Sequence, residues 1–209
     1  RKLHFGRQPW EIFFPVLKIA IVTTALSFIY KTWFVAKFCT LFWQAFSMSN
    51  SFLRARFFIT YIISWILNGT ILATVLSSAG PCFYGHIVEG PDPYAPLISF
   101  LHETDKVLPV WDLFAQDYLW RAYESTKVTL FSGISAMPSM HISLSFLFML
   151  VGWSVGRKAG IFFTVYLVLM FLGSVHLGWH YAIDGYLGAA ITWLIWWGGG
   201  KCLARQSAH

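Results

Sequence analysis

Two short segments of this chain carry the side chains best suited to chemistry, and each lies at the end of a long apolar run. Residues 137–141 end in His141, and residues 173–184 contain His180 and Asp184. An imidazole titrates near neutral pH and acts as a nucleophile or a proton donor. An ionisable residue at the end of a membrane helix costs stability unless it is paired or used. These residues therefore predict an active site.

Neighbouring residues extend this candidate site. His176, His180 and Asp184 are spaced four apart, so on helical backbone they would share one face. Pro138 and Ser139 suit the start of a helix, where free backbone amides can hold an anionic oxygen. The set supplies a nucleophile, an orienting carboxylate, a second imidazole and a phosphate cradle. A pure capping role for Ser139 and a packing role for His176 are the alternatives.

The composition predicts an integral membrane protein. Hydrophobic residues make up 57% of the 209 residues and charged residues 11%, against about 25% charged in soluble domains. The formal net charge of +6 requires no nucleic-acid partner, because the basic residues flank the apolar runs. Cys39, Cys82 and Cys202 are scattered and odd in number, so they predict neither a disulfide framework nor a thiolate metal site.

We expect six membrane crossings in a single all-α domain over residues 1–209. Five apolar runs have near-spanning length: 12–30, 57–79, 139–156, 160–178 and 183–200. The stretch 33–48 is shorter and contains Lys37 and Gln44, which leaves a re-entrant or interfacial helix open. Four basic clusters flank the runs: Arg1, Lys2 and Arg7; Arg54 and Arg56; Arg157 and Lys158; Lys201 and Arg205. If all four are cytoplasmic, 33–48 must cross and both termini lie inside.

The connection 80–137 would then lie outside, and its composition differs from the rest. It holds seven of the nine acidic residues. Its first half predicts turns, and residues 104–126 predict short amphipathic helices on the membrane surface. A solvated cap and a substrate-binding lid are both open. Lys106, Arg121 and Lys127 are expected to be solvated, with phosphate contact as the alternative.

The two segments resemble signature motifs of a known family. Residues 138–141 read Pro-Ser-Met-His, and residues 177–184 contain Leu-Gly, then His180, then Asp184. This order and spacing are similar to the second and third motifs of the type-2 phosphatidic acid phosphatase superfamily. Those motifs are Pro-Ser-Gly-His, and Ser-Arg followed by five residues, His, three residues and Asp. The resemblance covers about residues 77–192.

The resemblance implies a role for each matching residue. It makes His180 the nucleophile that forms a phosphohistidine and Asp184 the group that holds its imidazole. It makes His141 the acid that protonates the leaving oxygen and Ser139 a phosphate ligand. The predicted topology, rather than the resemblance, brings both motif segments to the same side, so we expect a common site on the extracytoplasmic or lumenal face.

Three departures from the family pattern point to one branch. Met140 replaces the usual Gly, and Ser174 stands where an Arg would bind phosphate. The first motif, Lys, six residues, Arg-Pro, is missing where Gly80 and Pro81 lie. Such losses resemble the branch of inositol phosphorylceramide synthase and sphingomyelin synthase, which moves a phosphorylated head group between lipids. Ser174, His176, Gly80 and Pro81 are therefore candidate phosphate-binding or pocket-lining residues, while Gly80-Pro81 could also be only a turn.

We therefore predict a lipid phosphotransferase that moves a phosphorylated head group, for example inositol phosphate. The partners are a membrane phospholipid donor and a lipid alcohol acceptor, with no metal or organic cofactor and no nucleic acid. Losing guanidinium contacts suits a diester of lower charge. The alternatives are a phosphatase acting on phosphatidic acid or polyprenyl phosphate with water as acceptor, a proton-coupled transporter, and a metalloenzyme using His176, His180 and Asp184. The head group, the acceptor and the oligomeric state are left open.

Overall fold

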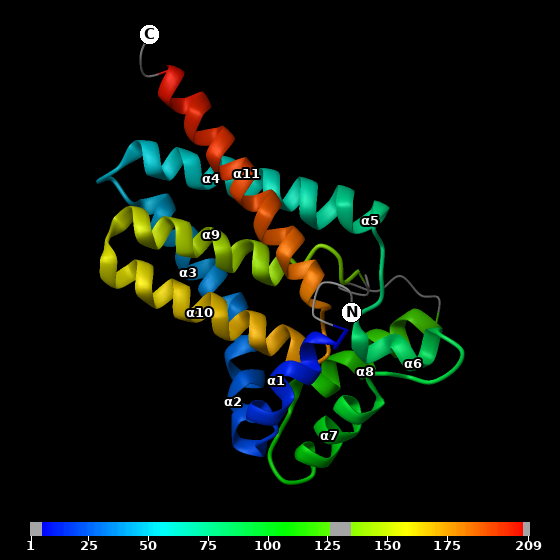
Figure 1. Cartoon of the computed structure of the whole chain (residues 1–209). Helices are drawn as coiled ribbons and strands as arrows, with labels where there is room; N and C mark the ends of the chain where they lie inside the picture. The colour runs from blue at the N-terminus through cyan, green and yellow to red at the C-terminus, as the bar shows by residue number, and fades with distance from the viewer. Residues whose placement is uncertain (1–5, 126–134, 207–209) are drawn as a thin grey trace.

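The computed structural model describes residues 6–125 and 135–206, which form helices and connecting loops without a β-strand (Figure 1). In chain order the α-helices are α1 (Pro9–Leu17), α2 (Ala20–Lys31), α3 (Trp33–Phe46), α4 (Ser51–Ile66), α5 (Ala73–Val75), α6 (Tyr84–Ile87), α7 (Ala95–Asp105), α8 (Trp111–Glu124), α9 (Met140–Val155), α10 (Arg157–His176) and α11 (Ala182–Gln206). A π-helical turn, Leu67–Leu72, joins α4 to α5, and a 3-10 turn, Pro81–Phe83, precedes α6.

The first two predicted crossings, 12–30 and 33–48, do not form a helical hairpin. Thr32 between α2 and α3 has helical backbone angles, φ −63° and ψ −11°. Its N–H donates to Phe28 O, and Ala36 N–H donates to Thr32 O, so helical hydrogen bonding continues through the junction. The chain breaks earlier, at the extended Ile19, and α1 lies at 119° to the rod Ala20–Phe46. Two predicted crossings are therefore one bent element.

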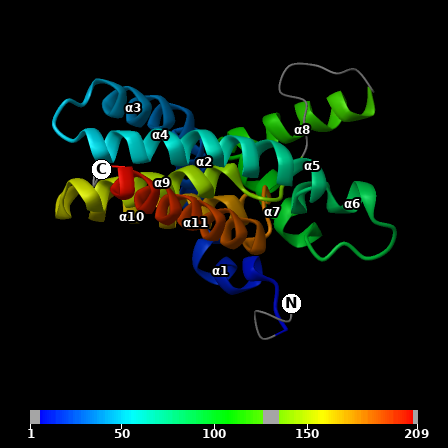
Figure 2. The same ribbon diagram turned by 90° about the horizontal axis from the view of Figure 1, so that it is seen from above.

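Because α2 and α3 form one rod, Arg7 before α1 lies apart from the other three basic clusters. Figures 1 and 2 both place the α3–α4 loop, the α9–α10 turn and the last turns of α11 at one end of the molecule. Arg54, Arg157 and Lys201 belong to these segments. Arg7 instead precedes α1, whose Trp10 packs with residues of α7 and the end of α10. In the structure Arg7 therefore precedes a helix that packs near α7, apart from the other basic clusters, while Arg1 and Lys2 lie outside the described residues.

Several helices are long and apolar enough to cross a membrane. Ser51–Val75 and Arg157–His176 each meet that length and composition, and α1 with the rod Ala20–Phe46 would add a third if the bent pair is one crossing. Met140–Val155 is apolar but shorter. The described helices thus support two or three of the six predicted crossings.

The helices that carry the candidate motifs pack closely. An added Cβ at Gly152 would lie 2.8 Å from Ala159 O, and one at Gly160 would overlap the Trp153 ring. Glycine at both positions lets α9 and α10 form a tight antiparallel pair. Fully buried side chains fill the core around this pair: Phe57, Leu144, Leu147, Phe148, Val151 and Met170.

Buried polar contacts tie α9 to the helices on either side. Asn68, in the π-helical turn, donates from its side-chain amide to Ser143 Oγ at 3.1 Å and to Thr192 Oγ1 at 3.5 Å. These bonds join α4, α9 and α11 in a region that would otherwise be apolar. A π-helical turn inside a longer helix often marks a functional site.

The segment between α5 and α9 contains more helix than predicted. The expected amphipathic helix within 104–126 corresponds to α8, but the half predicted as turns also contains α6 and most of α7. Leu97 and Leu101 of α7 are fully buried, and both pack against residues of the main bundle. It lies at the end opposite to the α3–α4 loop and the α9–α10 turn (Figures 1 and 2).

Candidate active site

The two motif segments meet where α9 and α11 begin. Ser139 N–H donates to Asp184 O at 3.1 Å, which links the starts of these helices directly. An added Cβ at Gly188 would lie 2.6 Å from Ser143 Oγ and 2.8 Å from Ser139 O. The close approach of α11 to α9 therefore requires glycine there.

His176, His180 and Asp184 do not share a helical face, contrary to the prediction from their spacing. Helix α10 ends at His176, and α11 begins at Ala182. Gly178 has φ +76°, a left-handed conformation that glycine adopts without strain, so the chain turns between them. The α10–α11 turn, residues 177–181, presents His180 by itself.

Ser174 closes this turn through its backbone. Its carbonyl accepts the N–H groups of Trp179 and His180, both at 3.1 Å. The residue is buried in the last turns of α10. Ser174 therefore fixes the backbone that carries His180, and its side chain is not part of the pocket lining.

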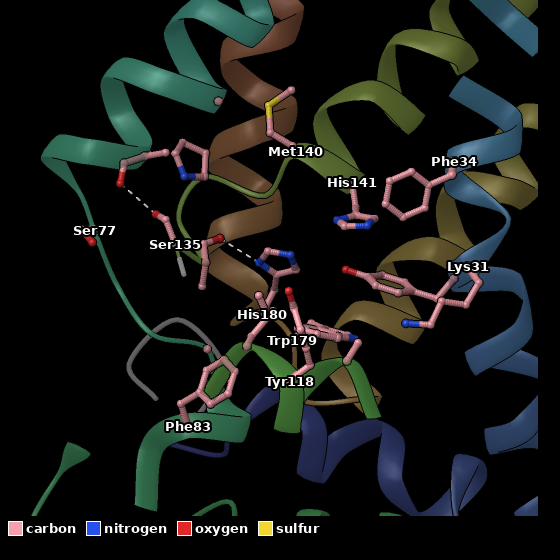
Figure 3. Close-up of a pocket in the computed structure, with 18 of the residues that line it drawn as sticks. Lys31, Phe34, Ser77, Phe83, Tyr118, Ser135, Met140, His141, Trp179 and His180 are labelled. Carbon is pink, nitrogen blue, oxygen red and sulfur yellow. Dashed lines mark hydrogen bonds between the residues drawn. The ribbon is translucent and has the colours of Figure 1, made fainter. Parts of the chain in front are cut away.

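His180 is held in one tautomer by a backbone carbonyl. Its Nδ1 lies 2.7 Å from Ala136 O. Because a carbonyl oxygen only accepts hydrogen bonds, Nδ1 must carry the proton, and in the neutral ring Nε2 is then free to attack. Figure 3 shows this bond as a dashed line at one edge of the pocket. Sequence reasoning missed Ala136, because a backbone acceptor leaves no residue-type signal.

Asp184 supports His180 at longer range. Its Oδ2 lies 3.7 Å from His180 Nδ1, beyond hydrogen-bonding distance, and accepts the backbone N–H of Tyr181 at 2.9 Å. The carboxylate is 1% exposed and sits in the first turn of α11, where the helix dipole stabilises a negative charge. It supplies a buried negative charge beside the ring, while Ala136 O makes the direct contact.

His141 faces His180 across the pocket (Figure 3). Their ring centroids are 6.0 Å apart. Tyr30 stacks on His141 at 4.5 Å between centroids, and Trp33 lies at 4.3 Å. Tyr30 and Trp33 therefore fix the plane of the His141 imidazole.

A pocket of about 750 Å³ opens beside the two histidines. Its lining comes from α2, α3, the π-helical turn, α5, α8 and both motif segments: Tyr30, Lys31, Phe34, Gly69, Ala73, Thr74, Ser77, Gly80, Phe83, Ala115, Tyr118, Leu119, Ser135, Ala136, Pro138, Met140, His141, Trp179 and His180. Most of these side chains are apolar or aromatic. Such a lining suits a ligand with a lipid tail and a small polar centre.

Of the predicted phosphate-binding residues, Gly80 lines the pocket and the others lie elsewhere. An added Cβ at Gly80 would overlap Trp179 O, so the chain passes very close to the α10–α11 turn. Pro81 begins the 3-10 turn and is buried. Ser139 is fully buried and its hydroxyl caps α9 by accepting the N–H of Ile142 at 3.5 Å.

His176 lies in a separate buried cluster. It is 2% exposed, and its Nε2 is 2.9 Å from Thr23 Oγ1. The rings of Phe14 and Phe100 lie 6.4 and 6.0 Å from its centroid. The structure thus gives His176 a packing role, because the break at Gly178 directs it away from His180.

Lys31 is the cation that sequence reasoning overlooked. It is the one side chain with a permanent charge among the described pocket-lining residues. Its Nζ lies 2.9 Å from Oδ1 of Asp112, a fully buried carboxylate on α8. A lysine inside an apolar helix is itself a signal of function, and that signal could have identified it.

The other basic candidates are engaged at the surface. Lys106 pairs with Glu103 at 2.6 Å, and Arg121 pairs with Asp117 at 2.8 Å. Both pairs are exposed, which fits the prediction that they are solvated. Lys127 lies outside the described residues.

Other reactive groups near the turn do not compete with His180. Burial raises the pKa of the Cys82 thiol well above its usual range, so it stays protonated. Burial, followed by the charge of Asp184, raises the pKa of Tyr181 to about 12. Within residues 6–125 and 135–206 no three His, Cys, Asp or Glu side chains form a group that could hold a metal ion.

Comparison with known proteins gives the chain its family. No curated protein and no solved structure matches it. A family model described as the PAP2 superfamily matches residues 1–198, nearly the whole length. With apolar helices of membrane length, this match indicates a membrane protein that acts on lipid phosphates. The chain belongs to the PAP2 superfamily, the type-2 phosphatidic acid phosphatases, and is an enzyme of the phosphatase or phosphotransferase type.

Proposed function

We propose that this enzyme moves a phosphorylated head group from a membrane phospholipid to a lipid alcohol through a phosphohistidine on His180. The observation that carries this proposal is the 2.7 Å contact between His180 Nδ1 and Ala136 O. It fixes the proton on Nδ1 and leaves Nε2 as the nucleophile, 6.0 Å between ring centroids from a second imidazole that can act as acid and base.

The reaction has two steps. In the first, Nε2 of His180 attacks phosphorus, the bond from phosphorus to the lipid oxygen of the donor breaks, and His141 gives that oxygen its proton. In the second, the acceptor hydroxyl attacks phosphorus, its proton passes to His141, and the phosphorus–nitrogen bond breaks. Both histidines return to their starting states, so no cofactor is consumed. Asp184 stabilises the positive charge that develops on His180.

The charges around the pocket favour a singly charged phosphodiester. Lys31 contributes a positive charge that Asp112 balances at 2.9 Å, and Asp184 adds a negative charge near His180. Among the described residues the site therefore carries no excess positive charge. A dianionic monoester requires more compensation than this, whereas a diester requires less.

We also propose that the site faces the extracytoplasmic or lumenal side. The α3–α4 loop, the α9–α10 turn and the last turns of α11 lie at the end opposite to the α6–α8 segment (Figures 1 and 2). Arg54 near the start of α4, Arg157 at the start of α10 and Lys201 near the end of α11 accompany them, and the positive-inside tendency makes that end cytoplasmic. Ser51–Val75 and Arg157–His176 would cross between these two ends, and the rod α2–α3 would add a third crossing if α1 and the rod form one bent span.

Mass spectrometry of lipids tests the reaction. Purified protein is incubated with phosphodiester lipids of different head groups, with ceramide and diacylglycerol as acceptors, beside His180→Ala as control. We expect a new lipid carrying the transferred head group with the native protein and none with His180→Ala. Rapid quenching in alkaline denaturant should trap a phosphorylated histidine at position 180, and later acid treatment should release the phosphoryl group.

The same assay separates the alternatives. Release of phosphate from phosphatidic acid at a rate that added acceptors do not change would identify a lipid phosphatase. Turnover of any lipid without an ion gradient would exclude an obligatorily proton-coupled transporter. Activity that persists in chelator would exclude a metal-dependent reaction.

A further inference from the structure

We propose that Lys31 binds the phosphate and that Asp112, on α8, is the positioning residue that sets the charge preference of the pocket. Asp112 does so by neutralising Lys31 while it anchors Trp179 in the α10–α11 turn. The inference rests on the proposed function and adds a residue pair outside the family motifs.

Asp112 is a buried carboxylate with three donors from two elements: Ser27 and Lys31 lie on α2, and Trp179 lies in the α10–α11 turn. Oδ2 accepts from Ser27 Oγ at 2.6 Å, and Oδ1 accepts from Trp179 Nε1 at 2.7 Å and from Lys31 Nζ at 2.9 Å. Its side chain is fully buried. A buried carboxylate is stable only with such partners, so this cluster is built around the charge of Asp112.

Lys31 reaches from this buried cluster into the pocket. Its side chain is 35% exposed, against 0% for Asp112, and it is among the residues that line the pocket. An ammonium group has three donors, of which Asp112 uses one. Figure 3 shows Lys31 on the same side of the pocket as Trp179, with His141 and His180 across the same space. The remaining donors are therefore placed to meet a phosphate oxygen.

Helix α8 also controls the turn that carries His180. Besides the bond from Trp179 to Asp112, Gln116 donates from its side-chain amide to Leu177 O at 2.8 Å. Both residues of α8 are buried and lie four apart, so one helical face contacts two points of the turn. The region predicted as an outer lid or cap thus contributes directly to the position of the nucleophile.

This arrangement determines which phosphate suits the pocket. With Asp112 charged, Lys31 can donate hydrogen bonds but adds no net charge, which suits a monoanionic diester. Without the charge of Asp112, Lys31 would present a full positive charge to the ligand, which would favour a dianionic monoester. The ratio of turnover on the two substrate classes therefore reports the state of this pair.

The experiment compares two substrates across four variants in detergent micelles. The ratio is kcat/KM for phosphatidic acid divided by kcat/KM for the phosphodiester lipid that the native protein uses. We expect Asp112→Asn to raise this ratio about tenfold and Lys31→Met to lower it about tenfold, the range of a hydrogen bond to a charged group. The double variant Lys31→Met with Asp112→Asn should give a ratio above that of Lys31→Met, because it also removes the uncompensated carboxylate, and below that of Asp112→Asn, which keeps the cation.

Asp117→Asn is the matched control. Asp117 lies on the same helix and pairs with Arg121, but that pair is exposed. We expect neither the ratio nor the rate to change. A ratio that stays constant in both single variants, with both rates lowered together, would mean that the cluster is only structural and would overturn the inference.

Loss of folding in one variant does not end the test. If Asp112→Asn does not fold, Lys31→Met and the double variant still test the pair, and equal ratios in these two variants and the native protein would count against the proposal. A native protein that turns over neither substrate, or a His180→Ala variant that retains activity, would instead refute the proposed function.

Discussion

His176 and His180 lie four residues apart, yet they occupy two different environments. His180 stands in a turn, lines the pocket and is fixed by Ala136 O at 2.7 Å. His176 ends α10, is 2% exposed and contacts Thr23 Oγ1 at 2.9 Å among aromatic rings. Gly178, at φ +76°, makes the difference, because it ends the helix that their spacing would otherwise continue.

The comparison shows that residue type and spacing identify a catalytic histidine only together with the backbone that carries it. A continuous helix would have placed both imidazoles on one face. The turn separates them, so that His180 lines the pocket and His176 packs inside the fold. Variants at these two positions and at the residues that orient them test this division.

The largest effect is expected at the nucleophile. His180→Ala should lower kcat/KM by about 10⁴- to 10⁶-fold, as removal of a covalent nucleophile does in other enzymes. Thermal unfolding in detergent should change little, because the ring lies in a turn at the pocket. Residual activity within tenfold of native, in folded protein, would contradict covalent catalysis by His180.

His141 should show a smaller loss that depends on the leaving group. General acid catalysis contributes about 10²- to 10⁴-fold, so His141→Ala should lose that much on a natural lipid. A substrate that leaves as nitrophenolate needs no proton, so it should recover most of the loss in His141→Ala and none in His180→Ala. Equal losses on both substrates would mean that His141 only binds the phosphate.

Asp184→Asn tests whether Ala136 O or Asp184 holds the imidazole of His180. If the carboxylate alone fixed the tautomer, the loss would reach about 10⁴-fold. Since Ala136 O already accepts from Nδ1 and Asp184 Oδ2 is 3.7 Å away, we expect a loss nearer 10²-fold, from weaker charge stabilisation. A loss of 10⁴-fold, measured as single-turnover rate, would show that the ring moves onto Asp184 during the reaction.

Much of this site could be predicted from sequence, and the limits have physical causes. His141, His180 and Asp184 carry distinctive side chains at a distinctive spacing, so the pattern led to the family that the chain belongs to. Ala136 acts through its carbonyl, which every residue possesses, and no pattern could select it. Lys31 was not considered, because the predicted crossing 12–30 ends just before it.

The fold shows the same division. Apolar runs identified most of the long helices within a few residues, because burial in a bundle or in lipid requires continuous hydrophobic length. The prediction of separate crossings at 12–30 and 33–48 was wrong, because Thr32 has no helix-breaking side chain and the helix continues through it. Bending at Ile19 and packing of α1 on α7 depend on tertiary contacts, which no local pattern contains.

A substitution at Gly80 tests whether the close contact between Gly80 and the α10–α11 turn is needed for activity. Because an added Cβ would overlap Trp179 O, Gly80→Ala should shift the α10–α11 turn and lower kcat/KM about tenfold, a typical cost of displacing a reacting group. Gly198→Ala in α11 is the control, since its Cβ would meet nothing within 4 Å. That change should leave activity unaltered and stabilise the helix by about 0.5–1 kcal/mol. Equal activity of the two variants would show that the turn tolerates displacement.

The smallest effect on catalysis is expected at His176. His176→Phe keeps a ring between Phe14 and Phe100 but loses the contact with Thr23 Oγ1, so stability should fall by about 1–2 kcal/mol. Turnover per folded molecule should stay within about threefold of native, less than 1 kcal/mol of barrier. Thr23→Val in a double-mutant cycle should couple to His176→Phe in stability and not in activity. If His176 instead supplied the positive charge that the missing arginine would give, activity would fall at least tenfold while stability stayed unchanged, and the division between the two histidines would fail.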